Sequence, residues 1–401
     1  MKKIINIKKA KKFIYLDNGA STPIDPQILR LLSRTLNKFY ANTKSIHQKG
    51  QEAKDLLEKS REGFAEKLKT SPGEIIFTSS STESNNLALK GVINFTSEKK
   101  HLIISNIEHS STTKAAKYLK DLDHEVSIAV ADKNGLIDLD HFKSLIKENT
   151  LLVSFNYVNH ELGTIQPISD IVKIINQERK KRVKEGNKTP IYLHIDATQA
   201  FGHMPINIKD MGIDLLTASS HKIYGPKGAG LLYVKKGVKI KPLFHGGEHE
   251  FGIRAGSVNL PAIYAFYKAY ELALQRMKKD DQKYKKMKKL IIKEITKKIP
   301  ESFINGDPKL QLNNVVNVRF NNVEGETLAF TLDYNNIGVS TGSACAINSI
   351  SDSTLFSIGL RPNEIQSSIR ISLGRFTSQQ DIDIFLKILI KCVTNLRKIS
   401  K

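Results

Sequence analysis

The 401-residue sequence has only two cysteines, Cys345 and Cys392, and no long hydrophobic run. So few cysteines exclude a disulfide framework and make a reducing compartment the default. No apolar segment reaches the roughly 18 residues that a membrane-spanning helix needs. The N-terminal stretch MKKIINIKKAKKF is basic, but it lacks the apolar core of a secretory signal and the Arg and Ser of a typical mitochondrial presequence. We therefore expect a cytoplasmic protein without a membrane segment.

Acidic residues are also scarce, since 40 Asp and Glu oppose 62 Lys and Arg and leave a net charge of +22. Such a charge attracts polyanions in general. The densest basic runs, KKMKKLIIKEITKK and NQERKKRVKEG, lie on predicted helices, where a charge run is usually a solvated face. Aromatic residues are not interleaved with them as stacking platforms for bases. We therefore do not expect nucleic acid to be a direct ligand.

Short apolar strands alternate with helices through the first two thirds of the chain. Strand-like segments occur at 73–80, 101–109, 150–163, 190–199 and 214–225, and Asp25 with Pro26 begins a helix near residue 26. This pattern predicts an α/β fold with a largely parallel sheet. After Pro261 the pattern changes to a long charged helix and mixed elements. We predict a large domain at 15–260 and a smaller α+β domain at 261–401, to which we assign residues 1–14.

The two cysteines have different surroundings. Cys345 lies in STGSACAINS, a run of small and polar residues. A reactive cysteine needs an accessible loop with polar or positive neighbours, whereas a buried free cysteine behaves as a small hydrophobe. The surroundings favour a reactive Cys345, with a structural role as the alternative. Cys392 lies among apolar residues at helical spacing, which predicts ordinary packing.

Polar residues follow the predicted strands, at the edge where ligands bind in open α/β sheets. They are Ser80–Glu83, His109, Asn159–Glu161, Asp196, Gln199 and Ser220–Lys222. Each alone is readily explained as solvated surface or, for Ser80–Glu83, as a helix N-cap. Together they provide a lysine, a carboxylate and an anion site at a helix N-terminus. That set suits pyridoxal 5′-phosphate (PLP).

Seven motifs, in order from about Tyr15 to the C-terminus, carry a resemblance to a known family. They are YLDNGASTPIDP, FTSSSTESNNLALKG, HIDATQ, SHKIYGPKG, HGGEHEFGIRAGS, STGSACA and SSIRISLGRFT. The sequence thus resembles the NifS/IscS-type cysteine desulfurases of the class V aminotransferases. The resemblance implies PLP-dependent fold type I, with a mostly parallel seven-stranded sheet in the large domain and a smaller C-terminal domain that carries the catalytic cysteine loop. It also implies a homodimer.

The resemblance further implies a role for each matching residue. Lys222 matches the Schiff-base lysine and His109 the histidine stacked on the cofactor ring, which also has a proposed acid–base role. Cys345 matches the mobile-loop cysteine that attacks the substrate sulfur and carries a persulfide. The other residues matched to cofactor binding are Asp196 at the pyridinium nitrogen, Gln199 at the phenolic oxygen, Ser81, Thr82, Ser219 and His221 at the phosphate, and Ser257 at the phosphate of the other subunit. The residues matched to substrate binding are Arg370 at the carboxylate, Asn42 and His160.

The implied function is conversion of L-cysteine to L-alanine. The sulfur would pass to an acceptor protein, either an iron–sulfur scaffold or a tRNA-thiolation factor. No resident metal is expected, although Cys345 could transiently ligate an iron–sulfur cluster. The alternatives are a selenocysteine lyase or another class V PLP enzyme, and an inactive basic interaction protein. Cys345 argues against the first two, and the intact residue set argues against the third.

The sequence departs from the family pattern at four places. His160 stands where an asparagine is usual, which predicts a changed substrate affinity or pH dependence. Ser80 and Ser81 replace the usual Gly-Ala or Gly-Gly, which we expect to cost backbone freedom. Residues 42–45 differ from the usual Asn-Pro-Ser-Ser. The sequence ends at Lys401, without the further tail by which IscS-type members dock the iron–sulfur scaffold, so we expect a NifS-like enzyme or another sulfur acceptor.

Overall fold

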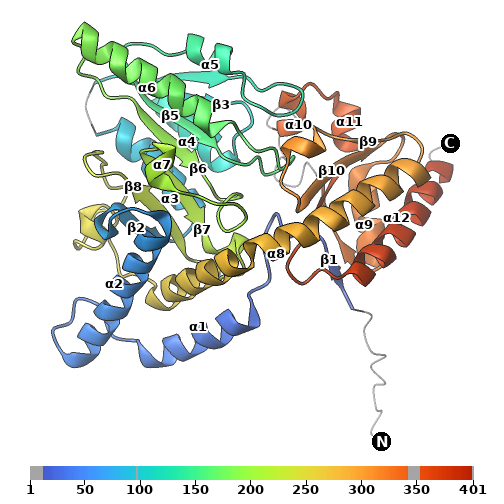
Figure 1. Cartoon of the computed structure of the whole chain (residues 1–401), viewed down its shortest axis with the longest axis horizontal. Helices are drawn as coiled ribbons and strands as arrows, with labels where there is room; N and C mark the ends of the chain where they lie inside the picture. Colours follow the sequence, from blue (N-terminus) through green and yellow to red (C-terminus); the bar gives the residue numbers. More distant parts are fainter. Residues whose placement is uncertain (1–11, 96–97, 342–352, 400–401) are drawn as a thin grey trace, which may run out of the picture.

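A seven-stranded sheet lies at the centre of the larger part of the molecule, which is seen at the left of Figure 1. The computed structural model describes residues 12–95, 98–341 and 353–399. Across the sheet the strands are β2 (Ile75–Thr78), β8 (Gly230–Val234), β7 (Leu215–Ser219), β6 (Tyr192–Asp196), β5 (Thr150–Asn156), β3 (His101–Ser105) and β4 (Glu125–Ala129). All run parallel except β8, which is antiparallel to both of its neighbours. The predicted α/β fold with a mostly parallel sheet is confirmed.

Helices cover both faces of this sheet, because its strands are apolar on both sides. In β3, Ile103 faces one core, while Leu102 and Ile104 face the other. The first core includes residues of α1 (Pro26–Lys38), α2 (Gln48–Leu68) and α6 (Ile168–Glu185). The second includes residues of α3 (Ser81–Ile93) and α4 (Ser110–Asp121). The remaining elements of this part are α5 (Leu139–Ser144), α7 (Ile208–Met211) and the 3-10 turns η1 (Pro72–Glu74), η2 (Ser220–Lys222) and η3 (Glu250–Gly252).

The smaller part of the molecule, at the right of Figure 1, is built around a four-stranded antiparallel sheet. Its strands, in order, are β12 (Ser340–Thr341), β13 (Ser368–Ser372), β10 (Val315–Phe320) and β9 (Ser302–Ile304). Beside it β1 (Ile14–Tyr15) pairs with β11 (Ile337–Gly338). The accompanying helices are α9 (Gly325–Tyr334), α10 (Thr354–Ser357), α11 (Pro362–Gln366), α12 (Gln379–Ile399) and the turn η4 (Pro308–Leu310). Cys392 is 5% exposed in the apolar core of this part, as its sequence context predicts.

The helix α8 (Leu260–Lys298) joins the two parts. Its first half contributes Phe266 and Tyr270 to the core beneath the large sheet, and its second half contributes Ile291 and Ile295 to the core of the small part. In the described part of the chain, no helix combines the length and the hydrophobicity needed to cross a membrane. The domain boundary at residue 261 stays a prediction.

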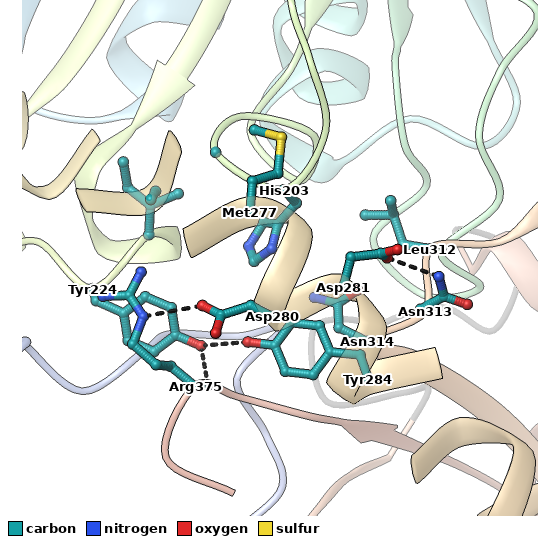
Figure 2. Close-up of a pocket in the computed structure, with 13 residues that line it drawn as sticks. His203, Tyr224, Met277, Asp280, Asp281, Tyr284, Leu312, Asn313, Asn314 and Arg375 are labelled. Atoms are coloured by element: carbon teal, nitrogen blue, oxygen red, sulfur yellow. Dashed lines mark hydrogen bonds and ion pairs between the residues drawn. The ribbon is translucent and has the colours of Figure 1, made fainter. Parts of the chain in front are cut away.

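Arg375 connects the two parts at their junction (Figure 2). Its guanidinium group lies 3.0 Å from Asp25 and 3.3 Å from Asp280, and it stacks on the Tyr224 ring at 4.2 Å. The Arg375 backbone N–H donates to the Tyr224 hydroxyl at 2.5 Å. Asp25 also caps α1 by accepting from the Gln27 N–H, as predicted for this helix. Because Tyr224 lies two residues after Lys222, this buried cluster fixes the segment that carries the lysine.

Candidate active site

The polar residues predicted at the strand ends lie at one edge of the large sheet. Asp196 is the last residue of β6, Ser219 ends β7, and His109 lies between β3 and α4. Since these strands are parallel, their carboxyl ends meet at the same edge. The topology therefore brings together residues that are far apart in the sequence.

Asp196 is held by two donors in a buried position. One carboxylate oxygen accepts from the Thr198 N–H at 2.9 Å, and the other accepts from the Asn85 side-chain amide at 2.7 Å. Asp196 is only 6% exposed. A buried carboxylate is stabilised by such donors, so Asp196 is a fixed negative charge at the sheet edge.

A loop that follows β1 approaches Lys222 and Gln199. The Lys222 ammonium donates to the carbonyl oxygens of Gly19 at 2.6 Å and Ala20 at 2.8 Å. The Gln199 amide donates to the same Gly19 oxygen at 3.1 Å. A side chain at Gly19 would meet Ser372 at 3.2 Å and the Arg370 guanidinium at 3.4 Å. A glycine here therefore lets the backbone lie close to Ser372 and to the predicted substrate-binding residue Arg370.

The predicted phosphate site lies at the beginning of α3. Ser80 caps the helix by accepting from the Glu83 N–H, and the first N–H groups of a helix lack intrahelical partners. Ser81 and Thr82 lie in this first turn, with Thr82 exposed. The backbone of Ser80 is extended, with φ −171°, and Ser81 is helical. The expected loss of backbone freedom at Ser80 and Ser81 is therefore wrong, because neither backbone conformation requires a glycine.

Ser219 and His221 come from the other side of this region, on and after β7. The Ser219 hydroxyl is buried without a hydrogen-bond partner among the described residues. Burial and the adjacent ammonium groups of Lys222 and Lys227 lower the pKa of His221 to about 4, so its imidazole is neutral at pH 7. An unsatisfied buried hydroxyl is costly, so Ser219 suits a group that accepts its hydrogen bond.

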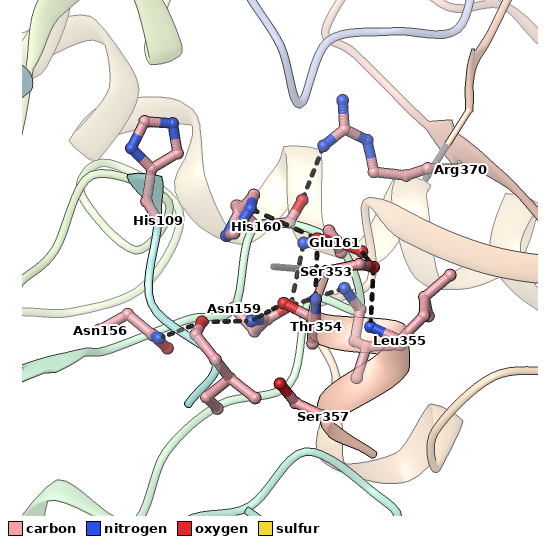
Figure 3. A network of polar contacts seen from close by, with 12 residues as sticks. His109, Asn156, Asn159, His160, Glu161, Ser353, Thr354, Leu355, Ser357 and Arg370 are labelled. Atoms are coloured by element: carbon pink, nitrogen blue, oxygen red, sulfur yellow. Dashed lines mark hydrogen bonds and ion pairs between the residues drawn. The ribbon is translucent and has the colours of Figure 1, made fainter. Parts of the chain in front are cut away.

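His109 and His160 pack against each other (Figure 3). Their ring centroids are 5.2 Å apart with the planes at 79°, an edge-to-face arrangement. Burial, together with His109, Arg370 and Lys222, holds the pKa of His160 well below its usual range. Burial also lowers the pKa of His109, although the Asp196 carboxylate opposes this shift. Both imidazoles are therefore neutral near pH 7.

Arg370 closes the site from the small part of the molecule. It lies on β13, is 8% exposed, and donates to the His160 carbonyl oxygen at 2.8 Å. Its other terminal nitrogen lies 2.9 Å from an Asp17 carboxylate oxygen. The Arg370 Nε atom is buried without a partner among the described residues. A guanidinium group in this position suits a carboxylate ligand.

Cys345 lies outside the described residues, but the chain on either side of it reaches the site. Upstream, Ser340 pairs directly with Arg370 in the small sheet. Downstream, the buried Glu161 carboxylate accepts from the Ser353 hydroxyl and the Thr354 N–H, each at 3.1 Å (Figure 3). Cys345 is four residues beyond Thr341, and four residues of fully extended chain span at most about 14 Å.

Asn42 and Ser257 are placed differently from the other predicted residues. Both line a surface hollow of about 430 Å³ with Phe39 and Tyr40. The Asn42 side chain accepts from the Lys44 N–H, within its own turn. Their roles in substrate binding and in the other subunit's phosphate site stay predictions.

The described residues fit PLP. They supply a lysine, a fixed carboxylate, an unsatisfied buried hydroxyl and a helix N-terminus. Asp17, Gly19, Asn85 and Ser111 also belong to this site, although the sequence reasoning did not single them out. Gly19 acts through its carbonyl oxygen, and the others act through contacts with predicted residues. Asp17 and Gly19 lie in the motif YLDNGASTPIDP and Asn85 lies in FTSSSTESNNLALKG, whereas Ser111 lies in none of the quoted motifs.

The family comparison covers nearly the whole chain. The profile of the aminotransferase class-V family matches residues 14–385. A curated cysteine desulfurase IscS of Dictyoglomus turgidum is 38% identical over 392 residues, 97% of each chain. A curated human cysteine desulfurase is 37% identical and covers 96% of this chain, which spans 83% of the human protein.

Solved structures agree with these sequence matches. A structure titled NifS-like protein superposes with a TM-score of 0.87 at 33% identity, covering 96% of this chain and all of that one. A NifS-like protein from Rickettsia africae gives a TM-score of 0.85 at 31% identity, with 96% and 100% coverage. The similarity thus extends over both parts of the fold.

Proposed function

Because the chain belongs to the class-V aminotransferase family, in its group of NifS/IscS-type cysteine desulfurases, we propose that it converts L-cysteine to L-alanine and retains the sulfur as a persulfide on Cys345. The observation that carries the assignment of Cys345 is the attachment of its segment. Ser340 pairs with Arg370 upstream, and Glu161 holds Ser353 downstream. Both attachments lie beside the candidate substrate site.

PLP is the cofactor that these residues would hold. Lys222 would bind it covalently, Asp196 would face the ring nitrogen, and Gln199 the phenolic oxygen. When bound, PLP supplies an electron sink for the charge left on the substrate's α-carbon. Ser81, Thr82, Ser219 and His221 would bind the phosphate, with Ser257 contributed to the other subunit of a homodimer.

The chain's own residues orient the substrate and move its protons. Arg370 would bind the carboxylate of L-cysteine, in place of or beside the Asp17 carboxylate that it contacts now. The Lys222 amine would then accept the α-proton, which requires its deprotonated form. His109 and His160 line the site as neutral rings.

Cys345 would act as the nucleophile through its thiolate. A sulfur–sulfur bond forms between Cys345 Sγ and the substrate Sγ as the substrate's Cβ–Sγ bond breaks. The electron pair of that bond stays with carbon and is protonated at Cβ, and return of the α-proton from Lys222 then gives alanine. The persulfide then passes its outer sulfur to an acceptor protein, for iron–sulfur cluster assembly or tRNA thiolation. A reducing cytoplasm is the compartment consistent with this exchange chemistry.

The decisive experiment measures alanine and sulfide released from L-cysteine, with PLP and a reductant, by the wild type and by Cys345→Ala. We expect the wild type to release both products and Cys345→Ala to release neither alanine nor sulfide. Cys392→Ala is the matched control, because this second cysteine packs in the core of the small part, and it should retain activity. A PLP-loaded wild type that makes no alanine, or an active Cys345→Ala variant, would refute the proposal.

A further inference from the structure

Asp196 and His109 are linked by hydrogen bonds through two other residues, Asn85 of α3 and Ser111 of α4. The Asn85 side-chain nitrogen lies 2.7 Å from Asp196 Oδ2 and 2.9 Å from Ser111 Oγ. Ser111 Oγ in turn lies 2.9 Å from His109 Nδ1. Asn85 is 0% exposed and Ser111 7% exposed. These hydrogen bonds are therefore shielded from water, which could otherwise replace one of the partners.

The direction of each hydrogen bond follows from the two residues at the ends of this hydrogen-bonded series, Asp196 and His109. An ionised Asp196 carboxylate can only accept, so the Asn85 group that faces it is the NH₂ donor. The same NH₂ group donates to Ser111 Oγ, which leaves the hydroxyl proton of Ser111 for His109 Nδ1. Independently, the Ser111 backbone N–H, which can only donate, lies 3.1 Å from the same Nδ1.

His109 Nδ1 thus accepts from two donors, and a neutral imidazole must then carry its proton on Nε2. We propose that Asn85 and Ser111 are positioning residues that hold His109 as the neutral Nε2–H tautomer, so that His109 serves the reaction as a hydrogen-bond donor and not as a proton carrier. The catalytic half of this inference rests on the proposed function, whereas the tautomer itself does not.

A proton on Nδ1 would oppose the structure around it. It would face two donors and remove the N-cap that His109 provides to α4. The titratable groups that face His109 are Asp196, Lys222 and His160. Only Asp196 favours an imidazolium ion. The acid–base role that the resemblance suggests for His109 is therefore disfavoured by its own surroundings.

Two substitutions at His109 separate the two nitrogens. Asparagine places an acceptor near the position of Nδ1 and is a preferred N-cap, whereas glutamine can place an NH₂ donor near the position of Nε2. We expect His109→Gln to keep about a tenth of the wild-type kcat/KM, since it retains one hydrogen bond, and to melt at a lower temperature. We expect His109→Asn to keep the melting temperature but lose more than about 100-fold in kcat/KM. Equal losses in both variants, of the roughly 10²- to 10⁴-fold size typical of general acid–base groups, would overturn the inference.

The tautomer is read directly from ¹⁵N resonances of histidine-labelled holoenzyme at pH 7, with His109→Gln to assign the signals. We expect a pyridine-like Nδ1 and a pyrrole-like Nε2 for His109. Ser111→Ala removes one donor and should shift the Nδ1 resonance, while Ser110→Ala, its neighbour on α4, should leave it unchanged. A pyrrole-like Nδ1, or identical spectra for the two variants, would refute the tautomer. Failure of the wild type to form alanine would refute only the proposed function, because these spectra require no turnover.

Discussion

At the scale of single residues, His160 is the departure from the family pattern with the clearest structural consequence. Its imidazole packs edge-on against His109, and its carbonyl oxygen accepts from Arg370. Its pKa is held well below the usual range. His160 therefore supports two functional residues without carrying charge near pH 7.

We predict that the ring of His160 matters through packing. His160→Phe keeps an aromatic edge and should retain kcat/KM for L-cysteine within about 2-fold. His160→Ala should lose about 2- to 10-fold, because an edge-to-face pair is worth about 0.5–1.5 kcal/mol. Neither variant should change the shape of the pH profile between pH 6 and 8, since the wild-type ring is already neutral there. A new or missing ionisation in this range would show that His160 titrates during the reaction.

Individual site residues were predictable where their chemistry is unusual for their position. Lys222 and His109 follow strands and Asp196 ends one, and the structure places all three at one edge of the sheet. Asn85 and Ser111 could not be predicted, because an asparagine and a serine in the first turns of helices are common. Their importance appears only when α3 and α4 bring them between Asp196 and His109.

At the scale of elements, the short helix α10 joins the segment of Cys345 to the large part of the molecule. Glu161 accepts from the Thr354 N–H and the Ser353 hydroxyl, and the Asn159 amide donates to the Thr354 hydroxyl at 3.1 Å. Ser357 adds a hydrogen bond to the Asn106 carbonyl oxygen at 2.6 Å. These contacts fix where the chain leaves the segment that contains Cys345.

We predict that Glu161→Ala slows persulfide formation without preventing cofactor binding. A misplaced nucleophile loses rate steeply with distance, so a fall of about 10-fold or more is expected. Persulfide on Cys345 is measured by mass spectrometry after rapid mixing with L-cysteine, beside the absorbance change that follows substrate binding. Glu185→Ala, at an exposed glutamate of α6, is the control. Equal persulfide rates in the two variants would contradict an anchoring role for Glu161.

The elements themselves were predictable to different degrees. Five strands of the large sheet and the start of α1 follow the apolar pattern and the Asp25 cap. Strands β4 and β8 were not singled out. β4 lies at the sheet edge, and only its last residue, Ala129, is buried, so its sequence lacks a clear apolar run. β8 follows β7 through a hairpin-like reversal, and Gly230 is needed because a side chain there would meet Ser80 at 2.7 Å.

At the scale of the whole molecule, the large core contains an acid that links stability to pH. Glu108, beside His109, is 4% exposed and accepts from the Asn156 backbone N–H at 3.0 Å and from the Ser105 hydroxyl. Burial, reinforced by the nearby Asp196 carboxylate, raises the pKa of Glu108 to about 8. The folded protein therefore holds a proton at pH 7 that the unfolded chain, with a glutamate pKa of about 4.3, releases.

This difference predicts how the free energy of unfolding changes with pH. A carboxyl group whose pKa is raised by folding stabilises the folded state fully below the unfolded pKa, and this contribution is lost as pH rises toward 8. Glu108→Gln is neutral at every pH, so its stability relative to the wild type should increase between pH 5 and 8, by at most about 1.4 kcal/mol per pH unit. Melting temperatures of both proteins at pH 5.5 and 8 measure this trend, with the exposed Glu62→Gln as control. A constant difference between Glu108→Gln and the wild type over this range would mean that Glu108 is ionised in the folded protein, and that two buried carboxylates, Glu108 and Asp196, lie charged beneath the candidate cofactor site.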